Sequence, residues 1–531
     1  MATVTLQKAR GAFYTDKPAT SRLVTWAIWD RNNCVLDPSC GDGAFLSMAE
    51  TRLRELGSKS PVIFGVDVSE EAIRDSRERI RGARLFHQNF FDLSPGDLPK
   101  FDSVVGNPPF IRYQTFNGDE RSKGQQRARE AGVKLPGLAS SWAPFVVHAS
   151  RFLRLGGRLA MVMPAELGHA MYARDVLKFL VRHFRHVAVE MFRNKIFSEL
   201  GQSTVLLFCD GYGEPCTRFL IASSDDISRD SRQAVAADVA AVEAGRFRFT
   251  HYVIPGAARD LYRRLAATKG VERLGDIAKV GIGYVTGANN FFHLSAEECR
   301  MWGIPHRFLK PCVLNLRGFS DFEYHREHWT RRRATGDKVY LLSLPSTPAE
   351  NLPGSVRRYL ESGVEGDVWR RYKCQVREFW YSVPHVRIAD AFLSYMSGEQ
   401  PLLVSNAANL VAPNTMHTLR FMRDADPLAS AVAWRSSLTR LSCELEGHAL
   451  GGGLFKLEPS EAENVLVVHT RRSCVRSIIS QVQALASTSA DAIRNITDRF
   501  VLKRQLGLTG NECALLQEAA LKAEAWRKHR Q

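Results

Sequence analysis

From residue 17 to residue 217 the chain alternates short runs of β-branched and other apolar residues with longer amphipathic stretches. This alternation is typical of an α/β fold in which a parallel sheet carries helices on both faces. The apolar runs predict strands over residues 34–37, 62–66, 103–106, 158–163, 187–192 and 204–209. The amphipathic stretches predict helices over residues 18–29, 44–56, 70–81, 141–155 and 173–184. Since the carboxyl ends of parallel strands open into a crevice, we expect ligand-binding residues in the loops that follow the strands.

The length of 531 residues predicts two to four domains at about 100–200 residues each. The alternation of apolar runs and amphipathic stretches breaks at two places. Residues 115–137 are polar and rich in Arg, Lys, Gln and Glu, which predicts a long functional or mobile loop. After residue 245, short runs with frequent Gly and Pro predict a second domain of mixed or mostly β structure over residues 246–476. Apolar residues at helical spacing then predict a helical segment over residues 477–531, of which residues 517–531 form a solvated face.

Charge and cysteine usage narrow the class of protein. Lys and Arg outnumber Asp and Glu by 72 to 56, which gives a net charge of +16 and makes nucleic acid the first candidate partner. A solvated basic surface without a partner is the alternative. The ten cysteines include no pair or Cys/His group at zinc-binding spacing, so we expect reduced thiols, no metal site and a cytoplasmic protein. The chain has neither a signal peptide nor an apolar run of about 18 residues, so we expect no membrane partner.

Residues 35–45, VLDPSCGDGAF, predict a strand that ends at Asp37, a turn of small residues, and a helix. Cys40, Gly41 and Gly43 lie in the turn, where glycine lets the backbone approach a ligand and the helix start supplies free amides. The segment lacks the Gly-X-Gly-X-X-Gly pattern and no phosphate-binding lysine follows, which disfavours NAD and nucleoside triphosphates. A plain strand-to-helix turn is the alternative.

Two further acidic residues follow at the ends of predicted strands. Asp67, in GVDVSEEAI, is placed to bind ribose hydroxyls, and Val68 beside it can pack against an adenine ring. Asp92, in NFFDL, ends a further short strand and can accept a hydrogen bond from an adenine amino group. Each aspartate alone could be a helix cap or a turn former, but three in successive positions favour an adenosine-bearing cofactor.

The segment GNPPF places Asn107, Pro108, Pro109 and Phe110 at the end of another predicted strand. Proline fixes the backbone and has no amide hydrogen, so the Asn107 side chain and nearby carbonyls form a rigid corner rich in acceptors. Such a corner holds an exocyclic amine with its lone pair free to attack, and Phe110 can stack on the flat group that carries the amine. A proline-rich turn with Phe110 in the core is the alternative.

These four segments, in this order and at these distances, resemble motifs I to IV of S-adenosylmethionine-dependent amino-methyltransferases. They are most similar to the gamma-class (TaqI-like) adenine-N6 DNA methyltransferases of the restriction-modification type. Residues 10–24, RGAFYTDKPATSRLV, resemble motif X of the same class. The resemblance implies a class I, Rossmann-like domain over residues 1–245, with a seven-stranded sheet whose last strand is antiparallel.

The resemblance assigns roles residue by residue, with S-adenosylmethionine as the cofactor. It implies cofactor contacts for Thr15, Asp37, Cys40, Gly41, Gly43, Asp67, Val68, Asp92 and Asn107. It implies that Asn107 and the Pro108 carbonyl bind the target amine next to Pro109, and that Phe110 stacks on the target base. Residues 194–208, NKIFSELGQSTVLLF, resemble motif VIII, which makes Phe197 the opposite wall of the base. Phe110 replaces the tyrosine common in this motif, so a phenolic hydroxyl is lost while stacking is kept.

The implied reaction is direct transfer of the methyl group to adenine N6, without a covalent enzyme intermediate. Because N6 lies inside the duplex, the base must be flipped out, which costs a few kcal/mol. The resemblance places motif X within the first residues, so we expect any restriction endonuclease to be a separate protein and this chain to act as a monomer.

The second domain bears on the choice of substrate. Its segments KVGIGYVTGANNFFHL (279–294), LKPCVLN (309–315), VREFWYSVP (376–384) and GGGLFKLEPSE (451–461) resemble DNA target-recognition domains. Candidate DNA contacts are Tyr284, Thr286, Arg331, Arg332, Arg333 and Lys338, although a basic run is usually a solvated face.

Three functions remain open from the sequence. The first is a sequence-specific methyltransferase acting on double-stranded DNA, in a restriction-modification or related defence or epigenetic system. The second is an RNA adenine or protein glutamine-amide methyltransferase, since related Asn-Pro-Pro motifs serve these substrates too. The third is a non-catalytic DNA-binding module, which the intact Asn107–Phe110 motif disfavours.

Overall fold

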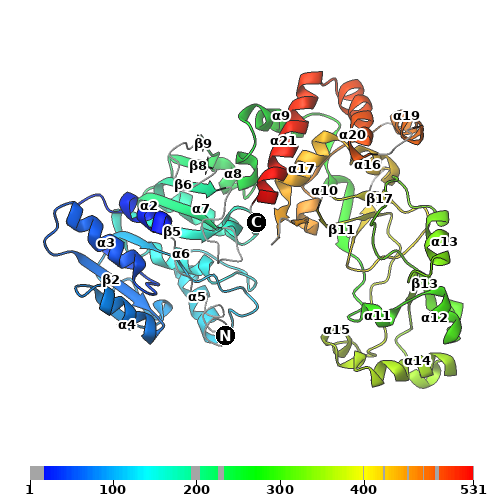
Figure 1. The fold of residues 1–531 in the computed structure, drawn as a ribbon, viewed down its shortest axis with the longest axis horizontal. Coiled ribbons are helices and arrows are strands. Elements are labelled where there is room, and N and C mark those ends of the chain that lie inside the picture. Colours follow the sequence, from blue (N-terminus) through cyan, green and yellow to red (C-terminus); the bar gives the residue numbers. More distant parts are fainter. Residues whose placement is uncertain are drawn as a thin grey trace. The chain divides into compact units, whose positions relative to one another are not determined.

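A computed structural model describes residues 17–192, 204–224, 233–398, 400–422, 425–450, 454–470, 472–484 and 489–529 (Figure 1). The chain forms two compact units that divide between Val253 and Ile254. We call the part before this division unit 1 and residues 254–527 unit 2. The helices predicted after residue 477 therefore lie within unit 2.

Within the described residues, unit 1 is built on one sheet of nine strands in the order β3-β2-β1-β4-β5-β7-β6-β8-β9. The strands are β1 (Cys34–Asp37), β2 (Val62–Asp67), β3 (Arg84–His87), β4 (Phe101–Gly106), β5 (Leu153–Pro164), β6 (Phe184–Phe192), β7 (Thr204–Tyr212), β8 (Arg218–Ser224) and β9 (Gln233–Ala236). Strand β7 runs antiparallel to β5 and β6, as predicted for the last of seven strands. Strands β8 and β9, which were not predicted, extend the sheet beyond β6.

The helices of unit 1 form two groups. Helices α2, α3 and α4 pack side by side, and so do α5, α6 and α7. Along the sheet, the crossover β1-α3-β2 runs in one direction and the crossover β4-α6-β5 runs in the opposite direction. Because such crossovers between parallel strands are right-handed, the two groups of helices cover opposite faces of the sheet. The helical elements are α2 (Lys17–Ala27), α3 (Ala44–Glu55), α4 (Glu70–Arg79), η1 (Phe90–Asp92), α5 (Gly118–Glu130), α6 (Trp142–Ser150), η2 (Ala165–Gly168), α7 (Ala173–His183), α8 (Val239–Glu243) and η3 (Phe249–Tyr252).

The strand order reverses between β1 and β4, which lie side by side as parallel neighbours. The chain leaves β1 towards β2 and leaves β4 towards β5, so the loops after β1 and β4 diverge. A crevice opens at such a switch point, and ligands bind there in open α/β sheets. The loops in question carry the predicted segments that follow Asp37 and Gly106.

The prediction of a loop over residues 115–137 is wrong, because helix α5 occupies most of it. Asp119 and Glu120 in its first turn, and Arg127 and Arg129 in its last turn, match the helix dipole. Only small side chains face inward, and a Cβ on Gly124 would lie 3.2 Å from the rings of Phe91 and Phe116. A helix with so little apolar periodicity gives no amphipathic signal in the sequence.

Unit 2 is mixed α/β rather than mostly β. Its described strands form four small sheets, β10-β21, β11-β18-β15-β17, β12-β14-β13 and β16-β20-β19. Their bounds are β10 (Val271–Arg273), β11 (Ala278–Ile282), β12 (His293–Leu294), β13 (Leu309–Pro311), β14 (Tyr340–Leu342), β15 (Ala391–Leu393), β16 (Met396–Ser397), β17 (Leu403–Ser405), β18 (His417–Phe421), β19 (His448–Ala449), β20 (Phe455–Lys456) and β21 (Leu466–Val468).

Helices surround these sheets and dominate the C-terminal part. They are α9 (Gly256–Ala266), α10 (Leu274–Ile277), α11 (Asn289–Phe292), α12 (Ala296–Met301), η4 (His306–Phe308), α13 (Arg326–Ala334), η5 (Ala349–Asn351), α14 (Gly354–Glu365), η6 (Val368–Arg370), α15 (Tyr372–Gln375), α16 (Pro427–Ala433), α17 (Ser437–Glu446), α18 (Pro459–Ala462), α19 (Arg472–Gln483), α20 (Ala490–Asp498), η8 (Arg499–Gln505, a π-helix) and α21 (Gly510–His529).

The last helix, α21, is not only a solvated face, as was predicted for residues 517–531. Leu516, Ala519 and Ala520 are fully buried on one side of it. Arg527 forms a buried ion pair with Glu444 of α17, with Nη2 at 2.8 Å from Oε1. The small alanine side chains bring α21 close to its neighbours, and hydropathy reports this poorly because alanine is only weakly apolar.

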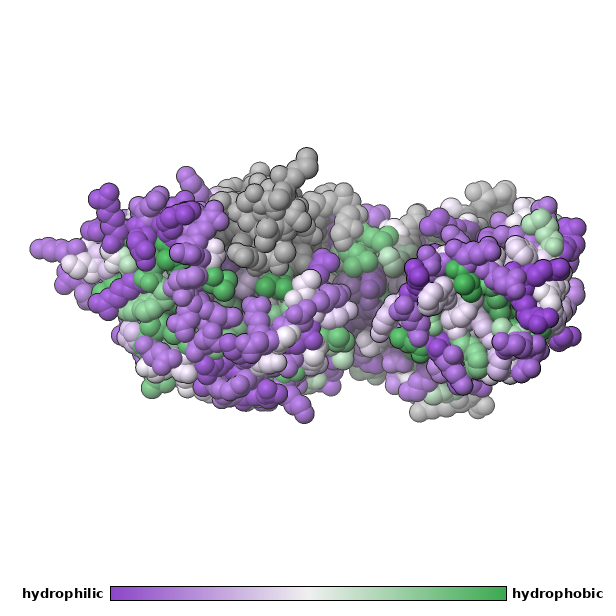
Figure 2. Space-filling model, turned by 90° about the horizontal axis from the view of Figure 1, so that it is seen from below, coloured by the Kyte–Doolittle hydropathy of each residue, from purple (hydrophilic) through white to green (hydrophobic). Residues whose placement is uncertain are grey.

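Hydrophilic residues cover most of the face shown in Figure 2, where exposed apolar residues form small separate patches. None of the described helices combines the length and the apolar character needed to span a bilayer.

Candidate cofactor and active site

Asp37 is the last residue of β1 and lies at the switch point, almost fully buried. Its Oδ1 accepts a hydrogen bond from the Ser39 amide at 3.0 Å, while Oδ2 has no hydrogen-bond partner in the described part of the chain. A Cβ on Gly106, at the end of β4, would lie 2.7 Å from Oδ1, so glycine is required for this close approach. The carboxylate therefore lies where the two key loops begin, with one oxygen able to accept a further donor.

Burial raises the pKa of Asp37 to about 8, and the neighbouring carboxylates Asp67 and Asp42 add to this rise. At pH 7 the ligand-free carboxyl is thus largely protonated, and a cationic ligand that requires the ionised form must displace a proton. We expect S-adenosylmethionine affinity to fall about tenfold per pH unit below pH 8 through this group. Calorimetry in buffers of different ionisation enthalpy measures the released proton.

Asp37→Asn is the matched control for this prediction, because the amide cannot ionise. It should bind the cofactor more weakly, and the part of the pH dependence due to Asp37 should disappear. Equal pH dependence in the wild type and in Asp37→Asn would contradict the prediction.

The turn after β1 is joined to the end of β2 by Asp67. The Asp67 carboxylate accepts hydrogen bonds from the Gly41 amide at 2.9 Å and from the Ser69 amide at 2.8 Å. Gly43 adopts a φ of 79°, and a Cβ there would lie 2.9 Å from the Ser76 hydroxyl, so only glycine fits. A Cβ on Gly41 would meet nothing within 4 Å, which leaves the space beside this turn open.

Cys40 and Val68 flank the same turn but differ in exposure. The Cys40 thiol is buried 3.8 Å from the Ser76 hydroxyl, and burial raises its pKa, so it stays a neutral core group. Because the thiol is buried, a cofactor contact by Cys40 would have to use its backbone rather than its side chain. Val68 is 62 % exposed and is available to pack against a flat ring.

Asp92 was predicted at a strand end but lies in the 3-10 turn η1, five residues after β3. Its carboxylate pairs with Lys123 of α5, whose Nζ lies 2.7 Å from Oδ1. Lys123 also contacts Asp119 at 2.8 Å, so the cation is shared between two carboxylates. Helix α5 thus supplies a counter-charge to the predicted adenine-binding aspartate, a contact that sequence reasoning missed.

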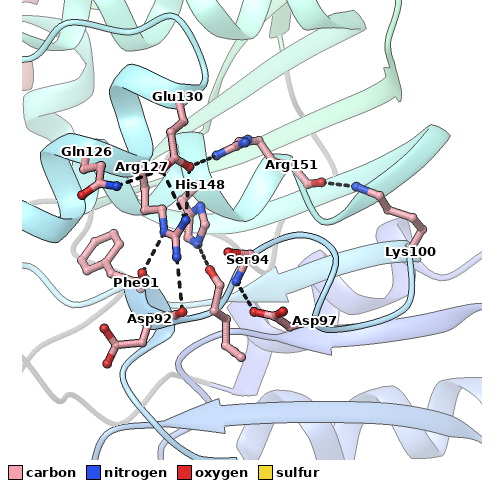
Figure 3. A network of polar contacts seen from close by, with 11 residues as sticks. Phe91, Asp92, Ser94, Asp97, Lys100, Gln126, Arg127, Glu130, His148 and Arg151 are labelled. Carbon is pink, nitrogen blue, oxygen red and sulfur yellow. Dashed lines mark hydrogen bonds and ion pairs between the residues drawn. The ribbon is translucent and has the colours of Figure 1, made fainter.

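The backbone of η1 is held by a network that links α5 to α6 (Figure 3). Arg127 donates to the Phe91 carbonyl at 2.8 Å and to the Asp92 carbonyl at 3.2 Å. His148 is fully buried on α6 and its Nε2 donates to the Leu93 carbonyl at 3.1 Å, and burial lowers its pKa to about 4. A neutral histidine and a fixed arginine therefore hold η1 in one position.

The Asn107–Phe110 loop follows β4 and is fixed at both ends. The Ser39 hydroxyl donates to the Asn107 carbonyl at 3.1 Å, which ties this loop to the one after β1. The Ser141 hydroxyl donates to the Pro109 carbonyl at 2.5 Å and accepts from the Ile111 amide at 2.9 Å. The structure therefore ties the loop after Asp37 to the loop after Gly106 at the switch point.

Phe110 is buried, with only 7 % of its surface exposed. Stacking of a base on this ring requires that the ring become more exposed than it is here. Thr15 and Phe197 lie outside the described residues.

Sequence reasoning missed a polar cluster that adjoins Ser141. The Tyr172 hydroxyl donates to Glu166 Oε2 at 2.6 Å and accepts from the Trp142 indole at 3.1 Å. Glu166 lies in η2, directly after the carboxyl end of β5. In the sequence, only the position of Glu166 directly after a strand could have indicated this cluster. Trp142 lies 24 positions from Glu166 and 30 positions from Tyr172, so their contacts leave no local pattern.

In unit 2, two predicted DNA contacts are buried and need correction. The Tyr284 hydroxyl bonds His293 Nε2 at 2.9 Å, and the Thr286 hydroxyl donates to Asn289 at 2.5 Å. Both side chains are at most 3 % exposed, so they shape the loop rather than face a partner.

The predicted basic cluster is divided between paired and exposed residues. Arg332 pairs with Asp337 at 2.7 Å and donates to the Asn315 carbonyl, while Lys338 pairs with Glu298 at 3.1 Å. Arg331 and Arg333 are exposed on α13. The structure thus leaves these two of the four cations free of ion pairs within the described residues.

The strand order with antiparallel β7, together with the acidic and Asn-Pro-Pro strand ends, defines unit 1 as a class I methyltransferase domain. Residues 1–210 match the N-6 DNA methylase family, and residues 246–502 match the C-terminal domain of type II methyltransferase M.Eco57I. The first 210 residues are thus similar to the N-6 DNA methylase family.

Individual relatives are distant in sequence. Type II methyltransferase M.AccI of Acinetobacter calcoaceticus is 19% identical over 467 residues, 86% of this chain and 84% of the relative. Type II methyltransferase M.HincII of Haemophilus influenzae is 23% identical over 197 residues, 37% of this chain and 36% of the relative. Among solved structures, the type IIL restriction-modification enzyme MmeI in complex with DNA has a TM-score of 0.58 at 12% identity, over 96% of this chain and 75% of that one.

Proposed function

We propose that this protein is a sequence-specific DNA methyltransferase that modifies adenine at N6 in double-stranded DNA as part of a restriction-modification system. The observation that carries this proposal is the fixed Asn107–Phe110 corner, which is tied to the loop after Asp37 by the Ser39 hydroxyl. The match of unit 2 to the C-terminal domain of a type II methyltransferase supports DNA as the substrate.

S-adenosylmethionine fits the residues at the switch point, and when bound it supplies an activated methyl group. The free Oδ2 of Asp37 suits a cationic ligand end, and the open space beside Gly41 leaves room for it. Asp67 at the end of β2 binds the ribose hydroxyls, exposed Val68 packs against the adenine, and Asp92 accepts from its amino group. Gly43 keeps the turn in shape, and Thr15 contributes from motif X.

The target adenine is flipped out of the duplex, because N6 is otherwise inaccessible. The Asn107 amide oxygen and the Pro108 carbonyl accept hydrogen bonds from its amino group, so the lone pair of N6 faces the methyl donor. Pro109 keeps the corner rigid, and Phe110 and Phe197 stack on the two faces of the base. Arg331 and Arg333 contact phosphates.

The protein acts as a monomer in the cytoplasm, and the cognate restriction endonuclease is a separate protein. An RNA or protein-amide methyltransferase would share the corner after β4. Such substrates do not explain why the chain carries a long, basic unit 2 that matches the C-terminal domain of a type II methyltransferase.

Modification-sensitive sequencing of DNA from cells that express this chain tests the proposal. We expect N6-methyladenine at one defined sequence motif, and no such motif in cells that express Asn107→Ala. Methylation of RNA or protein without any methylated DNA motif would show that the proposed substrate is wrong.

A further inference from the structure

Two neighbouring cavities open on unit 2, with volumes of about 810 Å³ and 370 Å³. Asn289 and Asn290 line both of them, so the two cavities adjoin, and we call them together the unit 2 groove. Side-chain amides recur along it, from Asn289, Asn290, Asn315, Gln400 and Asn414. An amide carries both a donor and an acceptor, and it therefore suits ligands that present both kinds of group.

The charge of the groove has one sign. Of the described residues that line it, four are Arg or Lys and none is Asp or Glu; the four are Arg317, Lys338, Arg371 and Arg435. Lys338 is paired with Glu298, and Arg435 donates to the carbonyls of Ser320 and Asp321. The exposed Arg371 guanidinium makes no hydrogen bond or ion pair within the described part of the chain. The groove thus offers an unneutralised cation beside neutral amides.

A basic and aromatic segment, residues 369–373, borders the groove at Arg371. Tyr372 is 71 % exposed and Trp369 is 38 % exposed, so both rings are accessible to a partner. The Lys373 ammonium lies 5.4 Å from the centre of the Tyr372 ring, and the Arg370 guanidinium lies 5.1 Å from that of Trp369. Arg and Lys side chains that are held beside aromatic rings are well placed to contact phosphates.

Buried contacts hold the parts of this surface in a fixed arrangement. Arg377 donates to the carbonyls of Val285 and Thr286 at 2.6 and 2.8 Å, across 92 and 91 positions of sequence. A Cβ on Gly287 would lie 2.8 Å from the Cβ of Lys373, so the two segments touch. The backbone N–H of Asn414 donates to the Tyr284 carbonyl at 2.9 Å, which joins the third segment. Thr286 therefore supports the segment that carries the exposed Asn289 and Asn290, and Tyr284 joins it to Asn414.

We propose that the unit 2 groove and residues 369–373 bind the recognition sequence in duplex DNA. In this arrangement the side-chain amides of Asn290 and Asn414 read base edges, and Arg371 contacts the DNA directly. Asparagine can bond adenine, and arginine can bond guanine, through two hydrogen bonds at once. The inference rests on the proposed function, since it assigns the part of unit 2 that selects the methylated sequence.

The combination of groups favours DNA over other partners. Phosphate binding alone needs only cations, whereas neutral amides within a fixed groove add the donors and acceptors that distinguish bases. The +16 net charge supplies long-range attraction to a polyanion, which a neutral small ligand would not use.

Methylation kinetics of full-length variants test this inference. Arg371→Ala and Asn290→Ala are compared with Arg358→Ala on α14 and Asn351→Ala in η5, which remove the same groups from exposed positions away from the groove. The substrates are duplex oligonucleotides with the motif found by sequencing and with each single-base change in it. S-adenosylmethionine affinity and the unfolding temperature report whether each variant is folded.

We expect Arg371→Ala and Asn290→Ala to lower kcat/KM on the motif by about ten- to a hundredfold, and to relax discrimination at one base position. The two control variants should stay within about twofold of the wild type. Arg371→Lys separates two contacts, because lysine restores a phosphate contact but not a two-bond guanine contact.

The outcomes separate this inference from the proposed function. If the wild type methylates its motif but the groove variants behave like their controls, the groove assignment is wrong and the proposed function stands. If Arg371→Ala weakens binding of single-stranded RNA but not of duplex DNA, the groove is an RNA site instead. A wild type that neither binds nor methylates duplex DNA overturns both.

Discussion

Replacing Asn107 by alanine is expected to lower the rate of methyl transfer to DNA by at least about a hundredfold. The substitution removes the side-chain acceptor that we propose for the reacting amine, while Ser39 continues to hold the Asn107 carbonyl. Affinity for S-adenosylmethionine should stay within about threefold of the wild type, because Asp37 and Asp67 are unchanged. Single-turnover transfer to a duplex and equilibrium cofactor binding measure the two quantities separately.

Asn117→Ala is the matched control for this prediction. Asn117 precedes α5, is exposed, and makes no side-chain capping bond. It should transfer methyl groups at the wild-type rate. A loss of cofactor binding in Asn107→Ala that equals the loss of transfer would place Asn107 mainly in cofactor binding rather than at the target amine.

Replacing Asp67 by alanine is expected to weaken S-adenosylmethionine binding by about a hundredfold or more, since each hydrogen bond to a charged group contributes about 1.5–3 kcal/mol. The variant loses the carboxylate that we propose as the ribose acceptor, and it also leaves the amides of Gly41 and Ser69 without their carboxylate partner. Transfer at saturating cofactor should recover much of the wild-type rate, because Asn107 is untouched. Titration calorimetry and kinetics at high cofactor concentration test both statements.

Asp75→Ala serves as the control for Asp67→Ala. Asp75 is an exposed aspartate on α4, and within the described residues its carboxylate forms one ion pair, with Arg74 at 3.8 Å. Normal cofactor affinity in Asp67→Ala would exclude the ribose role. A variant that unfolds would be seen as a lowered unfolding temperature, and Asp67→Asn then provides the milder test.

Much of unit 1 could be predicted from the sequence, because its information is local. The alternation of apolar runs and amphipathic stretches predicted β1, β2, β4, β5, β6 and β7, since strand and helix periodicities are read within one element. Gly43 illustrates the same point for the site, because its positive φ is a property of one residue that only glycine satisfies readily. Two strand ends, Asp37 and Asn107, followed from where the strands stop.

The features that could not be predicted depend on partners far along the chain. Helix α5 carries no apolar stripe, and its fit against Phe91 and Phe116 relies on the absence of side chains at Gly124. The contact of Lys123 with Asp92 appears only when α5 is folded against η1.

The sequence by itself determined which segments of unit 1 form β1, β2, β4, β5, β6 and β7, and where the glycine turn after β1 lies. The tertiary structure alone decided that Tyr284 and Thr286 are buried, that Cys40 is a core thiol, and that Arg371 is exposed in a groove. The physical reason is the range of the interactions: periodicity and backbone dihedrals are fixed by neighbouring residues, whereas exposure is fixed by contacts such as that of Arg377 with Val285, 92 positions away.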